Sequence, residues 1–228
     1  MALRACDPDR QPERYFNLRA HLPLKLAGTL LFVGVFFVGY FVLLNHPVRP
    51  VTVMPSLALD RAIGFHPWTL LLYGSLWFYV PLPPMLLARR RDLFAYAGAA
   101  AALAVVGLAV FLLWPTAVPP AEIDWAQYPG FEGLKQLDAS GNACPSLHVA
   151  FAVFTALALE RIFRIMGGRG VMRLINALWC VGIVYSTLAT KQHVVLDVLA
   201  GVALGVAAMG AWARAEGVRE WRDEGMRE

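Results

Sequence analysis

Six stretches of mostly apolar residues, separated by polar segments, dominate the pattern of this 228-residue chain. A helix needs about 20 consecutive apolar residues to cross a bilayer, and each stretch comes close to that length. Their ranges are 26–44, 68–88, 93–114, 146–163, 171–189 and 194–213. The pattern predicts an all-α, polytopic membrane protein with six transmembrane helices, forming a single domain over residues 1–228.

The composition also places the chain in the membrane class. Hydrophobic residues make up 58% and charged residues 16%, the mean hydropathy is +0.55, and a soluble domain has roughly 25% charged residues. Residues 1–25 are polar and no short apolar core with a small-residue cleavage site follows, so we expect no cleaved signal peptide. The cysteines Cys6, Cys144 and Cys180 are scattered, and their spacing implies neither a metal site nor a disulfide.

Lysine and arginine are unevenly distributed among the polar segments, and this predicts the orientation. With both termini in the cytoplasm, sixteen of the 20 cationic residues fall in cytoplasmic segments and four fall in outer segments. An excess of cations on the cytoplasmic side is typical of membrane proteins. The cytoplasmic parts then include an N-terminal segment, 1–25, and a tail, 214–228. The four outer cations are Arg49, Arg61, Lys135 and Lys191.

Two histidines open apolar stretches at the same predicted face of the membrane. His148 closes the string Asn-Ala-Cys-Pro-Ser-Leu-His at 142–148. Pro145 suits the first turn of a helix, and the free N–H groups of that turn, with the helix dipole, favour an anion. Ser146 adds a hydroxyl donor, and a protonated His148 could give a proton to a leaving oxygen.

The second histidine, His193, is followed by a carboxylate four residues later, Asp197. On one helix the two side chains would share a face. Asp197 would then orient the imidazole and leave its other nitrogen as a nucleophile. An ionisable residue just inside an apolar span is also a functional candidate in its own right. Lys191, two residues before His193, could bind a phosphate oxygen.

Three alternatives stay open on the residues alone. His148, His193 and Asp197 could supply three ligands to zinc, although there is no HExxH motif and no glutamate beside either histidine. The chain could be a lipid-binding membrane protein without catalysis. The outer segment 115–144 is long enough for a functional lid, and a plain connector is an equal alternative.

These residues resemble the signatures of the type 2 phosphatidic acid phosphatase superfamily. Pro145-Ser146-Leu147-His148 is similar to the second signature, P-S-G-H, and Ser186 to Asp197 is similar to the third, S-R-x5-H-x3-D. The variant is similar to the branch that contains inositol phosphorylceramide synthases. The resemblance implies that His193 attacks phosphorus to form a phosphohistidine, Asp197 orients it and His148 protonates the leaving group, without a metal or cofactor.

The chain departs from the family pattern at the phosphate-binding cations. The first signature, K-x6-R-P, is absent, and Thr187 stands where the third signature has arginine. We therefore expect Lys191, then Arg61, together with Ser146, to bind the phosphate.

The expected function is metal-independent hydrolysis of a lipid phosphate or diphosphate at the outer face of the plasma membrane (the inner membrane, in a bacterium). Transfer of a phospholipid headgroup is the alternative within the same chemistry. The expected partners are this lipid substrate and the surrounding membrane lipids, and no nucleic acid.

Overall fold

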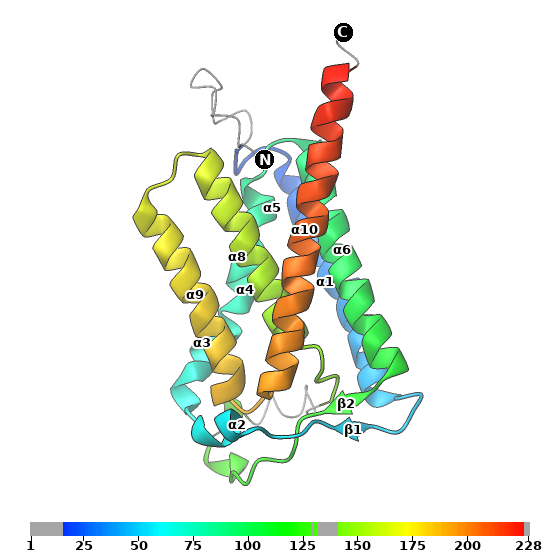
Figure 1. The fold of residues 1–228 in the computed structure, drawn as a ribbon, viewed down its shortest axis with the longest axis vertical. Helices are drawn as coiled ribbons and strands as arrows, with labels where there is room; N and C mark the ends of the chain where they lie inside the picture. Colours follow the sequence, from blue (N-terminus) through cyan, green and yellow to red (C-terminus); the bar gives the residue numbers. More distant parts are fainter. Residues whose placement is uncertain (1–15, 129, 132–140, 226–228) are drawn as a thin grey trace.

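Five long helices run side by side and form the body of the protein (Figure 1). The computed structural model describes residues 16–128, 130–131 and 141–225, with side chains up to residue 214. Most of this part of the chain is helical, as the apolar stretches predicted. The long helices are α1 (Leu22–Asn45), α6 (Arg90–Leu113), α8 (Leu147–Ile165), α9 (Gly170–Ala189) and α10 (Val195–Gly225).

Four of these helices are long and apolar enough to cross a membrane, so the chain is a membrane protein. They are α1, α6, α9 and the part of α10 from Val195 to Arg214. The fifth, α8, carries Glu160, Arg161 and Arg164 within its 19 residues, and it packs against α4, α5, α6, α9 and α10. It is therefore surrounded by protein, and a count of six spans stays a prediction.

The expected span 68–88 is not one continuous helix. It consists of η2 (Pro67–Thr69), α3 (Leu70–Gly74), α4 (Leu76–Tyr79) and α5 (Leu82–Leu86). Pro81, Pro83 and Pro84 lack the N–H group that continues a helical hydrogen-bond ladder, and their rings clash with the preceding turn. The hydropathy of this stretch predicted its burial in an apolar environment and could not predict its breaks.

The segments that connect the helices at one end of the bundle form a layer of short elements. Within it, β1 (Thr52–Val53) pairs in parallel with β2 (Thr116–Ala117), and α2 (Ala58–Ala62) and η3 (Trp125–Gln127) lie nearby. The helices α8 and α10 both begin at this end, which lies opposite the two chain termini (Figure 1). We refer to it as the loop end.

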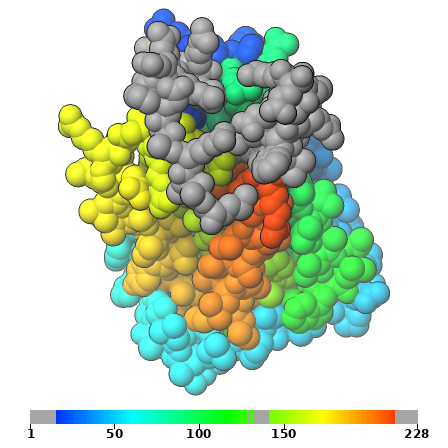
Figure 2. Space-filling view, turned by 45° about the horizontal axis from the view of Figure 1, so that its top comes forward, coloured from blue at the N-terminus to red at the C-terminus, as the bar shows by residue number. Residues whose placement is uncertain are grey.

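Two glycines bring α10 into direct contact with the backbone of α8. A Cβ atom on Gly201 would lie 2.4 Å from the carbonyl oxygen of Ser146, and one on Gly205 would lie 2.6 Å from that of Ala150. Small residues four apart let helix backbones approach closely in membranes. In the space-filling view α10 lies between α9 and α6 (Figure 2), so the start of α8 is held between its neighbours.

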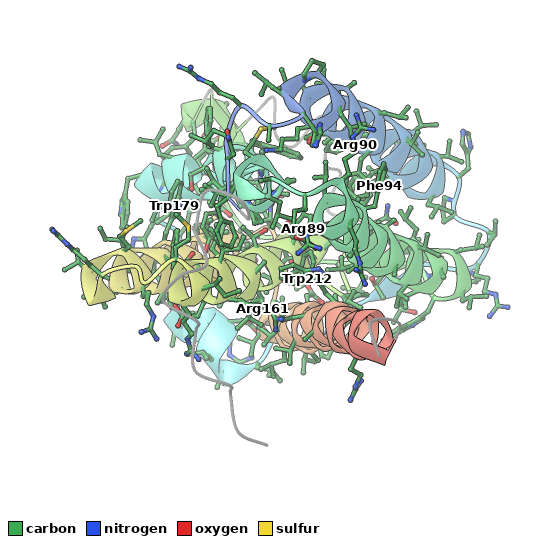
Figure 3. All side chains as sticks on the ribbon, turned by 90° about the horizontal axis from the view of Figure 1, so that it is seen from above. Arg89, Arg90, Phe94, Arg161, Trp179 and Trp212 are labelled. Atoms are coloured by element: carbon green, nitrogen blue, oxygen red, sulfur yellow. The ribbon has the colours of Figure 1, made fainter. Side chains whose placement is uncertain are left out.

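The cations of the described residues divide between the two ends of the bundle as the charge pattern predicted. Arg49 follows the end of α1, Arg61 lies in α2 and Lys191 precedes α10, all at the loop end, whereas the arginines at 89–91, 161–173 and 214 belong to the start of α6, the α8–α9 connection and the later part of α10, at the other end (Figure 1). At that second end the guanidinium carbon of Arg161 lies 5.8 Å from the ring centroid of Trp212 (Figure 3). Which end faces the cytoplasm stays a prediction.

Candidate active site

The first turn of α8 presents His148. The helix begins at Leu147, and the hydroxyl oxygen of Ser146, at the N-cap, accepts a hydrogen bond of 3.2 Å from the N–H of Val149. Pro145 therefore precedes the cap and does not lie in the first turn as expected, because serine is the better cap. Ser146 is fully buried, and its O–H remains able to donate.

Tyr73 of α3 holds the imidazole of His148 in place. The two rings stack with 3.9 Å between their centroids and 19° between their planes. The Nε2 atom of His148 is buried and has no hydrogen-bond partner among the described residues. Nε2 is therefore the nitrogen of His148 that a ligand would satisfy.

His193 lies in the turn before α10, not on the helix itself. Its backbone N–H donates to the carbonyl of Thr187 over 3.1 Å. Asp197, in the first turn of α10, reaches back, so that its Oδ2 accepts from the N–H of Val194 at 3.0 Å and lies 3.5 Å from Nδ1 of His193. The expected pairing is thus present, but it arises from a folded-back capping residue rather than from a shared helix face.

The starts of α8 and α10 bring the three candidate catalytic residues together. The backbone N–H of Ser146, two residues before His148, donates to the carbonyl oxygen of Asp197 over 3.0 Å, which joins the start of α8 to the start of α10. Asp197 is fully buried, and the side chain of His193 keeps 9% of its surface exposed. Because Nδ1 of His193 faces Asp197, Nε2 is the nitrogen available to a substrate.

Buried polar atoms without partners gather at this site. Among the described residues, five of the seven such side-chain atoms belong to it: Nε2 of His148, Nδ1 of His193, Oδ1 of Asp197, and Nε2 and Oε1 of Gln192. Buried polar groups are normally hydrogen-bonded, and each exception requires an explanation. A polar ligand between α8 and the turn before α10 would satisfy such atoms.

Lys191 is engaged with the loop layer. Its ammonium group donates to the carbonyl oxygens of Asp60, at 2.9 Å, and of Ile63. The Asp60 carboxylate in turn accepts from the N–H groups of Leu57 at 2.7 Å and Val195 at 2.8 Å. The segment around α2 is therefore clamped onto the start of α10. An ammonium group has three donors, so one remains for a phosphate oxygen.

The other candidate cations lie apart from this cluster in different ways. Arg61 is exposed and donates to the carbonyl of Ser56 over 3.0 Å, and Arg49 is also exposed. Lys135 lies outside the described residues. Thr187 is fully buried and its hydroxyl donates to the carbonyl of Val184, so no charge replaces the arginine at that position.

Part of the outer segment 115–144 packs on the loop layer through aromatic side chains. Phe65 follows the clamped segment, and its ring centroid lies 5.4 Å from that of Trp125, 5.0 Å from that of Tyr128 and 5.1 Å from that of Phe131. The segment is thus anchored next to the site. Lid and connector both remain compatible with this packing.

Sequence reasoning missed three residues that shape the site. Tyr73 and Asp60 are far from the histidines along the chain and carry no local signal. Gln192 is 2% exposed, and its position directly before His193 was the only indication available. All three act through tertiary contacts or burial, which a single sequence does not display.

Cys144 lies beside the site, just before Pro145. Burial, and then the charge of the nearby Asp197 carboxylate, raise the pKa of the Cys144 thiol to about 11. For the zinc alternative, no group of three or more His, Cys, Asp or Glu side chains in the described part of the chain is arranged to hold a metal ion. The cluster instead consists of two imidazoles and one carboxylate, those of His148, His193 and Asp197.

Comparison with known proteins gives one match. A family model for the PAP2 superfamily matches residues 50–211, a stretch that includes the loop layer and every residue of the site described above. No curated protein and no solved structure matches the chain.

Proposed function

Since the chain belongs to the PAP2 superfamily, whose members are generally phosphatases or phosphotransferases, we propose that it is a membrane enzyme that hydrolyses a lipid phosphate or diphosphate. The observation that carries this proposal is the contact between the start of α8, which bears His148, and the His193–Asp197 pair at the start of α10. The resemblance to the second and third signatures, at Pro145–His148 and Ser186–Asp197, supports the same roles.

In the proposed first step, Nε2 of a neutral His193 attacks phosphorus while His148 is protonated. A P–N bond forms, the P–O bond to the lipid breaks, and its electron pair leaves with the lipid oxygen. Nε2 of His148 gives its proton to that oxygen. Asp197 accepts from Nδ1 of His193 and stabilises its charge. The 3.5 Å separation of Nδ1 and Oδ2 would shorten when substrate binds, as catalytic hydrogen bonds commonly do.

In the second step a water molecule attacks phosphorus and gives a proton to His148. The P–N bond breaks, its electron pair returns to His193, and free phosphate leaves. Both histidines are then restored. In the alternative reaction an alcohol group of another lipid replaces water, and the product is a new phospholipid. This alternative rests on the likeness of the Pro145–His148 variant to the branch with inositol phosphorylceramide synthases.

The phosphate oxygens need donors in place of the missing cations. We propose the third N–H of Lys191, the hydroxyl of Ser146 and the amide of Gln192, whose two polar ends are buried without partners. Arg61 is exposed in α2, within the clamped segment, and would contribute if its hydrogen bond to the carbonyl of Ser56 broke. The loop end would face the exterior of the plasma membrane, since most cations lie at the other end.

The test is to incubate purified protein with a panel of lipid phosphates and headgroup donors and to measure free phosphate and new lipids. His193→Ala should abolish turnover, and a radiolabelled phosphate should be trapped on wild-type protein in an acid-labile, base-stable form. His46→Ala is the matched control, because His46 is exposed at the same end of the bundle. Free phosphate supports the phosphatase, and new lipid supports the phosphotransferase.

Two outcomes of this experiment would favour the other classes. Activity lost with EDTA and restored by zinc would support the metal alternative. Binding of the lipids without turnover, at every substrate and acceptor, would support a non-catalytic lipid-binding protein.

A further inference from the structure

Tyr73 contacts His148 through its aromatic ring. The ring centroid lies 3.9 Å from that of the imidazole, and the two planes differ by 19°. Tyr73 itself is 8% exposed. One residue of α3 therefore fixes the plane of the imidazole, and Nε2 of His148 has no hydrogen-bond partner among the described residues.

The break between α3 and α4 belongs to the same arrangement. Residues 70–74 form a helix of five residues, and Ser75, which joins it to α4, keeps a right-handed helical conformation. Helix α3 packs on α9 and α4 packs on α8, so the short pieces hold Tyr73 against the first turn of α8. A straight helix through 68–88 would orient its side chains by helical periodicity alone.

We infer that Tyr73 is a positioning residue for His148: it holds the imidazole so that Nε2 faces the leaving oxygen of a phosphate ester. This inference rests on the proposed function. Tyr73 acts through His148 and need not touch the substrate.

The role of a general acid depends on the leaving group, and this gives a specific test. An alkyl phosphate needs its leaving oxygen protonated. A nitrophenyl phosphate releases nitrophenolate, which is a stable anion and needs no proton to leave. General acid catalysis contributes about 100- to 10,000-fold. Tyr73→Leu should therefore lower kcat/KM, which reports the first step alone, by roughly 10- to 100-fold on the alkyl phosphate and by less than about threefold on the nitrophenyl phosphate.

Three variants sharpen the comparison. Tyr73→Phe keeps the ring and the backbone and should behave as wild type on both substrates. His148→Ala should show the same selective loss as Tyr73→Leu, only larger. The double variant should lose little beyond His148→Ala, because residues that act as a unit are not additive.

The outcomes separate this inference from the proposed function. If wild-type protein turns over neither substrate, both fail. If wild type is active and Tyr73→Leu lowers both substrates equally, or Tyr73→Phe shows the selective loss, the positioning role is overturned. Should Tyr73→Leu fail to fold, Tyr73→Met, which keeps most of the buried volume, takes its place with the same expected selectivity.

Discussion

Gly201→Ala is expected to separate the two histidines without touching either. The added Cβ would lie 2.4 Å from the carbonyl oxygen of Ser146 and 3.1 Å from Cβ of Val149. Real contacts of this kind rarely fall below 3.0 to 3.4 Å, so the carbonyl must retreat by about 0.6 to 1.0 Å. Ser146 caps α8 two residues before His148, and the first turn therefore moves with it.

The size of the effect follows from this displacement. Overpacking of a well-packed contact costs about 1 to 3 kcal/mol of stability. A misplacement of about 1 Å in a catalytic group can cost on the order of 100-fold in rate. The carbonyl of Asp197 accepts from the N–H of Ser146, so Asp197 and its contact with His193 would shift as well. We expect kcat to fall by roughly 100-fold, with a smaller change in KM.

The assay is phosphate release from a lipid phosphate, together with the thermal unfolding midpoint in detergent. Gly210→Ala is the matched control, because it lies on the same helix and its added Cβ meets nothing within 4 Å. It should leave activity unchanged and stability unchanged or slightly raised. The reasoning is refuted if Gly201→Ala and Gly210→Ala are equally active.

Three further predictions concern the site. Asp197→Asn should lower kcat by about 1,000- to 10,000-fold with little change in KM, because the carboxylate orients His193. A rise in KM of similar size would instead assign Asp197 to substrate binding. Lys191→Ala should cost on the order of 100-fold in rate and Lys191→Arg less, whereas Arg61→Ala should fall between wild type and Lys191→Ala; a severe Arg61→Ala beside a neutral Lys191→Ala would contradict this order. The raised pKa of Cys144, about 11 against the ordinary 9.0, lowers its thiolate fraction at pH 8, so alkylation followed by mass spectrometry should be roughly 100-fold slower than for an ordinary thiol. The rate should rise with pH up to about 11 and be faster in Asp197→Asn, and an unchanged rate in that variant would exclude the influence of the carboxylate.

The helices could be predicted from the sequence where hydropathy and helicity coincide. Four of the six expected ranges match long helices to within about one helical turn at both ends, and a fifth, 194–213, matches the start of α10, which continues to Gly225. The exception, 68–88, is also apolar but is divided into short helical pieces, and Pro81, Pro83 and Pro84 lie at the last division, at the start of α5. Hydropathy reports the transfer of side chains from water and contains no information on the hydrogen bonds that prolines remove.

The candidate site could be predicted only in its local part. The spacing of His193 and Asp197 and the string ending at His148 identified side chains that the structure brings together. The stack of Tyr73 on His148 and the clamp between Asp60 and Lys191 depend on packing between distant segments. Lys191 illustrates the difference: its place two residues before His193 suggested a free cation, whereas two of its donors already bind backbone carbonyls.

The central position of α8 has a consequence for biogenesis. Glu160 pairs with Arg173 of α9 at 2.6 Å and with Arg164 of its own helix at 2.6 Å, and Arg161 lies over Trp212 of α10. These charges lie at the end of the bundle opposite the loop end, and their partners on α9 and α10 hold that end of α8 in place. A nascent chain that ends after α8 lacks these partners, so stable placement of this helix should begin only once α9 has been synthesised.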